Sequence, residues 1–96
     1  MRYELVYTVK ANGTLDRLEA EDQRKFAKVR KTLGLIESNL RNPGLRTHKY
    51  QGLIGDNGED VWEAYVENNT PGAYRVFWHY GPGQRVITIV AITPHP

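Results

Sequence analysis

Three short apolar segments in the C-terminal third constrain the fold most strongly. They are "VWEAYVE" (residues 61–67), "AYRVFWHY" (residues 73–80) and "RVITIVAI" (residues 85–92), and the turn-like stretches "NNTPG" and "GPGQ" separate them. Their β-branched and aromatic residues favour strands, and such short connections join antiparallel neighbours. The last segment is apolar at nearly every position, which is typical of a strand covered on both faces. We therefore expect an antiparallel meander in which residues 85–92 form a central strand.

The N-terminal half predicts one strand followed by two helices. Residues 2–9 alternate between polar and apolar, "ANGT" reads as a turn, and Thr14 would cap a short helix. A second helix is expected over residues 21–40, because apolar residues recur there at spacings of three and four. This stripe consists of Phe26, Val29, Leu33, Ile36 and Leu40. Residues 45–60 have no clear period and are expected to form a loop, with an extended stretch at its start as an open alternative.

These elements predict an α+β fold of order β-α-α-β-β-β, formed by residues 1–96 as a single domain. A helical hairpin would pack on one face of a four-stranded, mostly antiparallel sheet. The other face of the sheet would stay partly open, as a shallow concave surface.

Composition excludes several classes of function. The chain has no cysteine, so disulfides, thiol chemistry and thiolate metal sites are excluded. No run of about 18 apolar residues would cross a membrane, and the first ten residues lack the apolar core of a signal peptide. A cytoplasmic protein without membrane association is therefore expected.

Positive charge gathers in "RKFAKVRK", residues 24–31. With Lys25, Lys28 and Lys31 near the side opposite the apolar stripe, this segment suits a phosphate backbone or an acidic protein partner. Alternatively, it is a solvated helix face balanced by Glu21 and Asp22. The sequence leaves both interpretations open.

Strand alternation sorts the side chains of residues 61–80 onto two faces. The apolar set, which should meet the helices, includes Trp62, Ala64, Val66, Tyr74, Val76 and Trp78. The polar set should converge on the open face and comprises Glu63, Tyr65, Glu67, Arg75 and His79. Arg75 would then be either a phosphate ligand or the ion-pair partner of Glu63 or Glu67.

The histidines give no metal signature. His48, His79 and His95 are 31 and 16 residues apart, without the local pairs of a zinc site. We therefore expect no metal and no cofactor.

The chain resembles the RelE/ParE toxin superfamily over nearly its whole length. The resemblance is carried by the element order and by "VWEAYV", "AYRVFWHY" and the closing "RVITIVAITPHP". It implies a cytoplasmic toxin of a type II toxin-antitoxin system, partnered by a cognate antitoxin. One branch of the family cleaves mRNA in the ribosomal A site without metal, and another inhibits DNA gyrase.

The resemblance also implies roles for individual residues. Arg75 matches the arginine that grips phosphate, and His95 matches a histidine that acts as general acid or base. His48 and Lys49 fall where relatives place basic or proton-transfer residues. The two positions that are Lys or Arg in strong ribonucleases are Glu63 and Tyr65 here. Pro96 stands where some relatives have a catalytic tyrosine.

If the protein is an endoribonuclease, a base, an acid and phosphate-binding cations are required. The candidate bases are His48 and Glu63, and the candidate acid is His95. Further candidates for substrate binding are Arg46, Lys49, Tyr50, Tyr65, His79, Lys25, Lys28 and Lys31. The alternative is a non-catalytic protein of this fold, either a gyrase-inhibiting toxin or a binding module.

Overall fold

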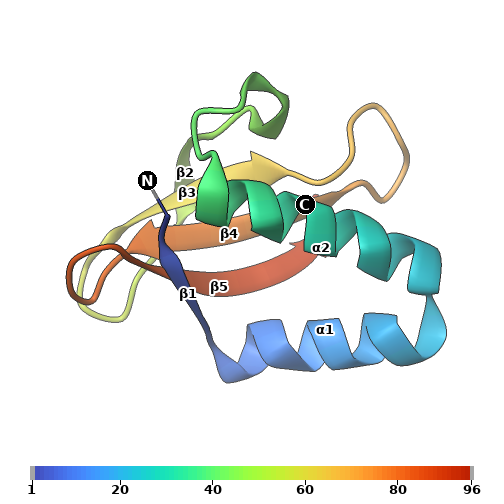
Figure 1. The fold of residues 1–96 in the computed structure, drawn as a ribbon, viewed down its shortest axis with the longest axis horizontal. Helices are drawn as coiled ribbons and strands as arrows, with labels where there is room; N and C mark the ends of the chain where they lie inside the picture. The colour runs from blue at the N-terminus through green and yellow to red at the C-terminus, as the bar shows by residue number, and fades with distance from the viewer. Residues whose placement is uncertain (1, 96) are drawn as a thin grey trace.

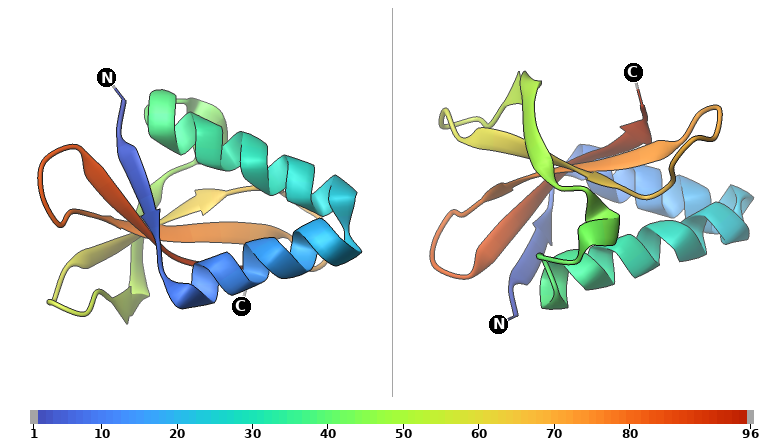
Figure 2. Two further views of the ribbon diagram at one scale, coloured as in Figure 1. Left: turned by 60° about the horizontal axis from the view of Figure 1, so that its bottom comes forward. Right: turned by 90° about the horizontal axis from the view of Figure 1, so that it is seen from above.

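A single sheet backed by two helices forms the protein in the computed structural model, which describes residues 2–95 (Figure 1). The elements in chain order are β1 (Glu4–Tyr7), α1 (Val9–Glu21), α2 (Gln23–Ser38), the 3-10 turn η1 (Pro43–Leu45), β2 (His48–Ile54), β3 (Asp60–Tyr65), β4 (Tyr74–Tyr80) and β5 (Val86–Pro94). Both helices lie on the same side of the sheet (Figure 2). The predicted α+β class and helical hairpin are therefore confirmed.

The sheet has the strand order β1-β5-β4-β3-β2. Strand β1 pairs in parallel with β5, and the other pairs are antiparallel. The two parallel neighbours are far apart in the chain, because both helices and strands β2 to β4 lie between them. Strand β5 has a neighbour on each side, as its unbroken apolar sequence predicts.

The expectation of four strands was wrong, because residues 48–54 form a fifth strand where a loop was predicted. β2 lies at the edge of the sheet, and its pairing with β3 is irregular between Tyr50 and Ile54. Most of its side chains are exposed, so neither face is consistently buried. An edge strand of this kind has no alternating apolar pattern for a sequence to display.

The start of the first helix was also misplaced. "ANGT" lies inside α1, which begins at Val9 rather than after Thr14. The cap is Thr8, whose side-chain oxygen accepts a hydrogen bond from the Ala11 N–H at 3.1 Å. The same hydroxyl donates to the carbonyl oxygen of Val90 at 2.7 Å. This tertiary contact, together with the cap, outweighs the cost of a helical glycine, which is about 1 kcal/mol relative to alanine.

Helix α2 matches the prediction more closely. It runs over Gln23–Ser38 and begins after Asp22, whose carboxylate accepts from the Lys25 N–H at 3.1 Å. Its apolar stripe packs on the sheet as expected, with Val29, Leu33 and Ile36 buried. None of the helices described by the structure is long and apolar enough to span a membrane.

The helix-facing side of the sheet carries the main core. Trp78 is fully buried there and stacks on Trp62, with ring centroids 6.1 Å apart. The face away from the helices carries a smaller apolar cluster around Phe77, which Tyr50 of β2 covers at a centroid distance of 4.8 Å. This second cluster fills one part of that face, and the polar residues around Glu63 occupy another part.

Candidate functional site

A buried carboxylate lies at the centre of the polar part of the open face. Glu63 lies in the middle of β3, and its side chain is only 2% exposed. Its oxygen Oε1 is 2.7 Å from Nε2 of His48, the residue opposite it in β2. Its other oxygen, Oε2, is 3.5 Å from Nδ1 of His95 and 3.7 Å from Nε of Arg75. The four residues of this group, called the Glu63 cluster below, were all among those predicted from the sequence.

Contacts on several sides hold Arg75 in place. Its guanidinium lies 3.7 Å from the ring centroid of Tyr65, the residue opposite it in β3. Its Nη1 donates to the carbonyl oxygens of Glu67 at 2.6 Å and of Tyr74 at 3.2 Å. The side chain is 6% exposed. The guanidinium is therefore fixed in one orientation by its neighbours.

Two atoms of the cluster have no hydrogen-bond partner although they are buried: Oε2 of Glu63 and Nε of Arg75. They face each other at 3.7 Å, which is too far for a hydrogen bond. Buried polar groups in proteins are nearly always paired, so two orphans side by side are unusual. A carboxylate oxygen and an N–H donor thus lie side by side without a hydrogen bond at this point.

His48 lies between two hydrogen-bond acceptors. Its Nδ1 is 2.8 Å from the carbonyl oxygen of Arg46, while its Nε2 faces the carboxylate of Glu63. Both ring nitrogens of His48 therefore face hydrogen-bond acceptors.

His95 lies at the rim of the cluster. Its backbone N–H donates to the carbonyl oxygen of Ala73 at 2.7 Å, which ties the end of the described chain to the start of β4. Its ring is half exposed and borders a hollow of about 540 Å³. This hollow, called the His95 hollow below, is lined by Tyr65, Arg75, His95 and residues 68–73. "NNTPG", predicted only as a turn, thus forms one wall of the site. Pro96 lies outside the described residues.

The remaining candidates on the open face lie around or away from the cluster. The Arg46 guanidinium is 5.7 Å from the ring centroid of Tyr65 and so borders the site. Tyr50 packs on the second apolar cluster. The Lys49 ammonium pairs with Asp60 at 3.3 Å. In the sheet, Lys49 lies opposite Trp62, whose side chain faces the helices. His79 is buried farther along β4, where its Nδ1 meets the carbonyl oxygen of Tyr80 at 2.8 Å.

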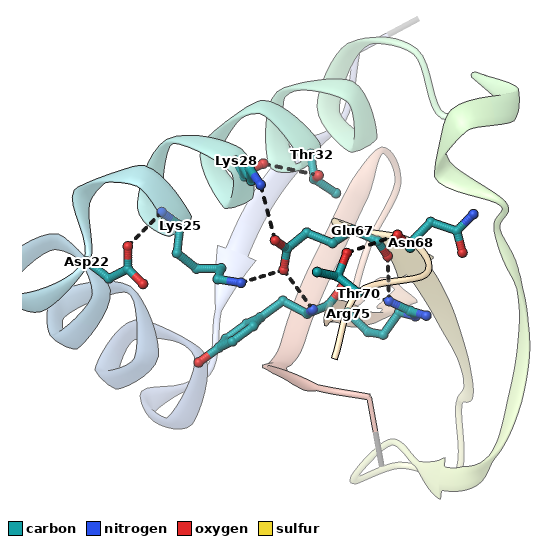
Figure 3. A network of polar contacts seen from close by, with 9 residues as sticks. Asp22, Lys25, Lys28, Thr32, Glu67, Asn68, Thr70 and Arg75 are labelled. Atoms are coloured by element: carbon teal, nitrogen blue, oxygen red, sulfur yellow. Dashed lines mark hydrogen bonds and ion pairs between the residues drawn. The ribbon is translucent and has the colours of Figure 1, made fainter. Parts of the chain in front are cut away.

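The prediction that Glu67 faces the open side was wrong. The N–H groups of Val66 and Glu67 both point to the carbonyl oxygen of Tyr74, at 3.1 and 3.4 Å, so two residues oppose one at the end of β3. Such a bulge breaks the alternation on which the prediction depended. The Glu67 carboxylate lies on the helix side, where it pairs with Lys25 at 2.6 Å and Lys28 at 3.2 Å (Figure 3).

The basic segment of α2 is therefore partly neutralised within the molecule. Glu67 is the main partner of Lys25 and Lys28, whereas Asp22 serves as the helix cap. Lys31 is exposed and, with Lys28, lines a hollow of about 580 Å³ between α2, η1 and the β3–β4 connection. Within residues 2–95, no group of three or more His, Asp or Glu side chains is arranged to hold a metal ion.

No protein-family model and no curated protein matches the sequence. Solved structures do match over essentially the full chain. RelE in the RelE-RelB complex from Pyrococcus horikoshii OT3 is 17% identical, with a TM-score of 0.67 and coverage of 98% of this chain and 96% of that one. YafQ in the E. coli DinJ-YafQ toxin-antitoxin complex is 11% identical, with a TM-score of 0.69 and coverage of 99% and 94%.

A third match is YoeB in the YoeB-YefM complex from Staphylococcus aureus, with 14% identity, a TM-score of 0.68 and complete coverage of both chains. At such low identity, the matches establish the architecture rather than the activity. The sequence of residues 61–96 had already indicated a likeness to proteins of this kind. The chain therefore has the same fold as RelE, YafQ and YoeB.

Proposed function

We propose that this protein is a RelE-like toxin that cleaves mRNA at the ribosome without a metal ion. The observation that carries the proposal is the Glu63 cluster. A buried carboxylate, two histidines and an arginine converge beside an open hollow. These are the group types that RNA cleavage through the 2′-hydroxyl requires.

In the proposed reaction, a base removes the proton of the 2′-hydroxyl, and the 2′-oxygen attacks the adjacent phosphorus. The new O2′–P bond forms as the P–O5′ bond breaks. An acid then protonates the departing 5′-oxygen. The products are a 2′,3′-cyclic phosphate and a 5′-hydroxyl, so atoms and charge balance without a cofactor.

The geometry favours a particular division of roles. Glu63 is the proposed base, because its Oε2 has no hydrogen-bond partner. His95 is the proposed acid, because it is half exposed at the rim of the hollow. Arg75 would stabilise the charge of the phosphorane. His48 is better suited to orienting Glu63 than to acting as a base, since both its ring nitrogens face acceptors.

Substrate entry would require His95 to leave Glu63, since the carboxylate is almost fully covered in the free protein. The side chain of His95 follows the last paired residue of β5 and is half exposed, so this movement disturbs no strand pairing. Arg46, which borders Tyr65, would supply further positive charge for the RNA backbone. Lys49 pairs with Asp60, and His79 contacts the carbonyl oxygen of Tyr80, so neither is assigned a role in the reaction.

We also propose that the protein has a cognate antitoxin. This is supported by the likeness to YafQ, which was solved as a toxin-antitoxin complex with DinJ. The structures of RelE with RelB and of YoeB with YefM add to that support.

The alternative is a toxin or binding module without nuclease activity. Two observations favour it. Arg75 is almost fully buried and donates to backbone carbonyls rather than into the hollow. The negative charge of Glu63 also lies where a phosphate would bind. A gyrase inhibitor or a non-enzymatic module would tolerate both features.

A translation assay with purified ribosomes distinguishes the proposed nuclease from the alternative without nuclease activity. The wild-type protein should cleave a translated mRNA, and Glu63→Gln and His95→Ala should each lower the cleavage rate by about 100-fold or more. Glu4→Gln, which removes an exposed carboxylate from β1, is the matched control and should cleave normally. Growth arrest that persists with Glu63→Gln and His95→Ala, without mRNA cleavage, would reject the nuclease in favour of the alternative.

A further inference from the structure

Glu67 connects the two faces of the sheet. It follows β3 at the bulge, and it contacts α2 through its side chain and Arg75 through its backbone (Figure 3). Arg75 belongs to the Glu63 cluster on the opposite face. A single residue thus joins the basic segment of α2 to the candidate site.

The carboxylate of Glu67 is held firmly on the helix side. Its Oε1 accepts from Lys25 at 2.6 Å and from the Tyr74 N–H at 3.2 Å, while Oε2 accepts from Lys28 at 3.2 Å. The side chain is 8% exposed. Burial alone would raise the pKa of Glu67, but these three hydrogen bonds hold it below its ordinary value. The carboxylate is therefore an ionised anchor.

The carbonyl group of the same residue orients Arg75. Its oxygen accepts from Nη1 at 2.6 Å, the shorter of the two hydrogen bonds that this nitrogen makes to backbone carbonyls. Glu67 belongs to the connection between β3 and β4, residues 66–73, which lies outside the strands. The Glu67 backbone is held beyond β3 by one long hydrogen bond, from its N–H to the Tyr74 carbonyl oxygen at 3.4 Å. The three hydrogen bonds of the side chain add to this single backbone contact.

We propose that Glu67 is a positioning residue for Arg75, and that Lys25 and Lys28 hold it in place from α2. The effect on the reaction depends on the proposed nuclease function, whereas the effect on the orientation of Arg75 does not. The two lysines would then serve the site from the far side of the sheet rather than by touching RNA.

The first test measures the orientation of Arg75 directly. NMR spectra of the guanidinium Nε–H and Nη–H groups should show restricted rotation in the wild type, because Nη1 is hydrogen-bonded and the group stacks on Tyr65. Glu67→Ala and the double substitution Lys25→Met/Lys28→Met should release this restriction. Lys25→Arg/Lys28→Arg should retain it, because arginine can still donate to the carboxylate.

The second test measures RNA cleavage by the same variants with ribosomes. A displacement of about 1 Å in a catalytic group can lower a rate about 100-fold, so kcat should fall about 10- to 100-fold in Glu67→Ala and in the methionine variant. KM should change by less than about threefold, since the effect lies in stabilising the transition state. The arginine variant should restore kcat. Arg24→Gln, which removes an exposed charge from α2, is the control and should behave as the wild type.

The two measurements test the positioning role and the proposed function separately. An unchanged guanidinium spectrum in Glu67→Ala would overturn the positioning role, whatever the activity. A folded wild-type protein that cleaves no RNA would overturn the proposed function, while the spectra would still decide the positioning role. Loss of kcat in Arg24→Gln to the same extent as in the lysine variants would show that total helix charge, and not the Glu67 anchor, controls the reaction.

Discussion

Replacing Glu67 with glutamine should destabilise the protein in a pH-dependent way. The substitution keeps the shape and an acceptor oxygen for the Tyr74 N–H, but it removes the negative charge that Lys25 and Lys28 share. The Lys25 side chain is 21% exposed and that of Lys28 is 47% exposed, so the first pair should contribute more than the second. The variant therefore isolates the charge of this anchor.

The magnitude follows from these two contacts. A hydrogen bond to a charged group contributes about 1.5–3 kcal/mol, and a neutral acceptor retains about half of that at Lys25. The half-exposed pair with Lys28 contributes about 0.5 kcal/mol. The free energy of unfolding should thus fall by about 1.5 kcal/mol near neutral pH. In a domain of this size, such a loss lowers the melting temperature by about 6–12 °C.

The sign of the pH dependence is fixed by the lowered pKa of Glu67. A carboxylate with a lowered pKa in the folded state stabilises the protein above its ordinary pKa, which is 4.5 for this group. That stabilisation is lost as the pH falls below 4.5 and the folded carboxylate takes up its proton. The wild type and Glu67→Gln should therefore differ most near neutral pH and converge in acid.

Urea unfolding followed by tryptophan fluorescence, from about pH 7 down to about pH 3, measures this difference. Glu19→Gln, an exposed position on α1, serves as the control and should change the unfolding free energy by less than about 0.5 kcal/mol at any pH. Equal stability of wild type and Glu67→Gln near pH 7 would refute the reasoning. A difference that stays constant into acid would refute the assigned cause.

Substitutions at four further positions test the fold and the site by thermal or urea unfolding. Thr8→Ala should cost about 1–2 kcal/mol, because its hydroxyl caps α1 and donates to a carbonyl of β5, and Thr8→Ser should recover most of the loss. Ile36→Ala should cost about 3 kcal/mol in the main core, whereas Leu53→Ala on the exposed edge strand should cost less than about 1 kcal/mol. Tyr65→Leu should cost about 1–2 kcal/mol, since it removes the ring on which Arg75 stacks, and an unchanged stability would contradict that contact.

The parts of the fold with a strong period were predictable from the sequence. The stripe of α2 and the meander of β3, β4 and β5 follow from spacings that burial imposes on one face. β2 escaped prediction because it is an irregular edge strand with mostly exposed side chains. The start of α1 depended on a contact between Thr8 and β5, which local sequence does not reveal.

The site was predictable to a similar degree. Strand alternation placed Glu63 and Arg75 on one face, and the structure brings them to 3.7 Å. The approach of His48 depends on the register between β2 and β3, and β2 itself was not predicted. Glu67 was misplaced because alternation fails at a bulge, and no residue type in "VENN" marks that bulge in advance. Long-range register and irregular backbone, rather than residue chemistry, limited the prediction.

The central claim is that the Glu63 cluster cleaves RNA through the 2′-hydroxyl. The most direct measurement is mass spectrometry of the fragments that the purified protein releases from ribosome-bound mRNA. We predict a 2′,3′-cyclic phosphate on one fragment and a 5′-hydroxyl on the other, with the yield lowered about 100-fold or more by Glu63→Gln. Cleavage that survives replacement of the 2′-hydroxyl by hydrogen at the cut site, or that is undiminished in Glu63→Gln, would contradict the account.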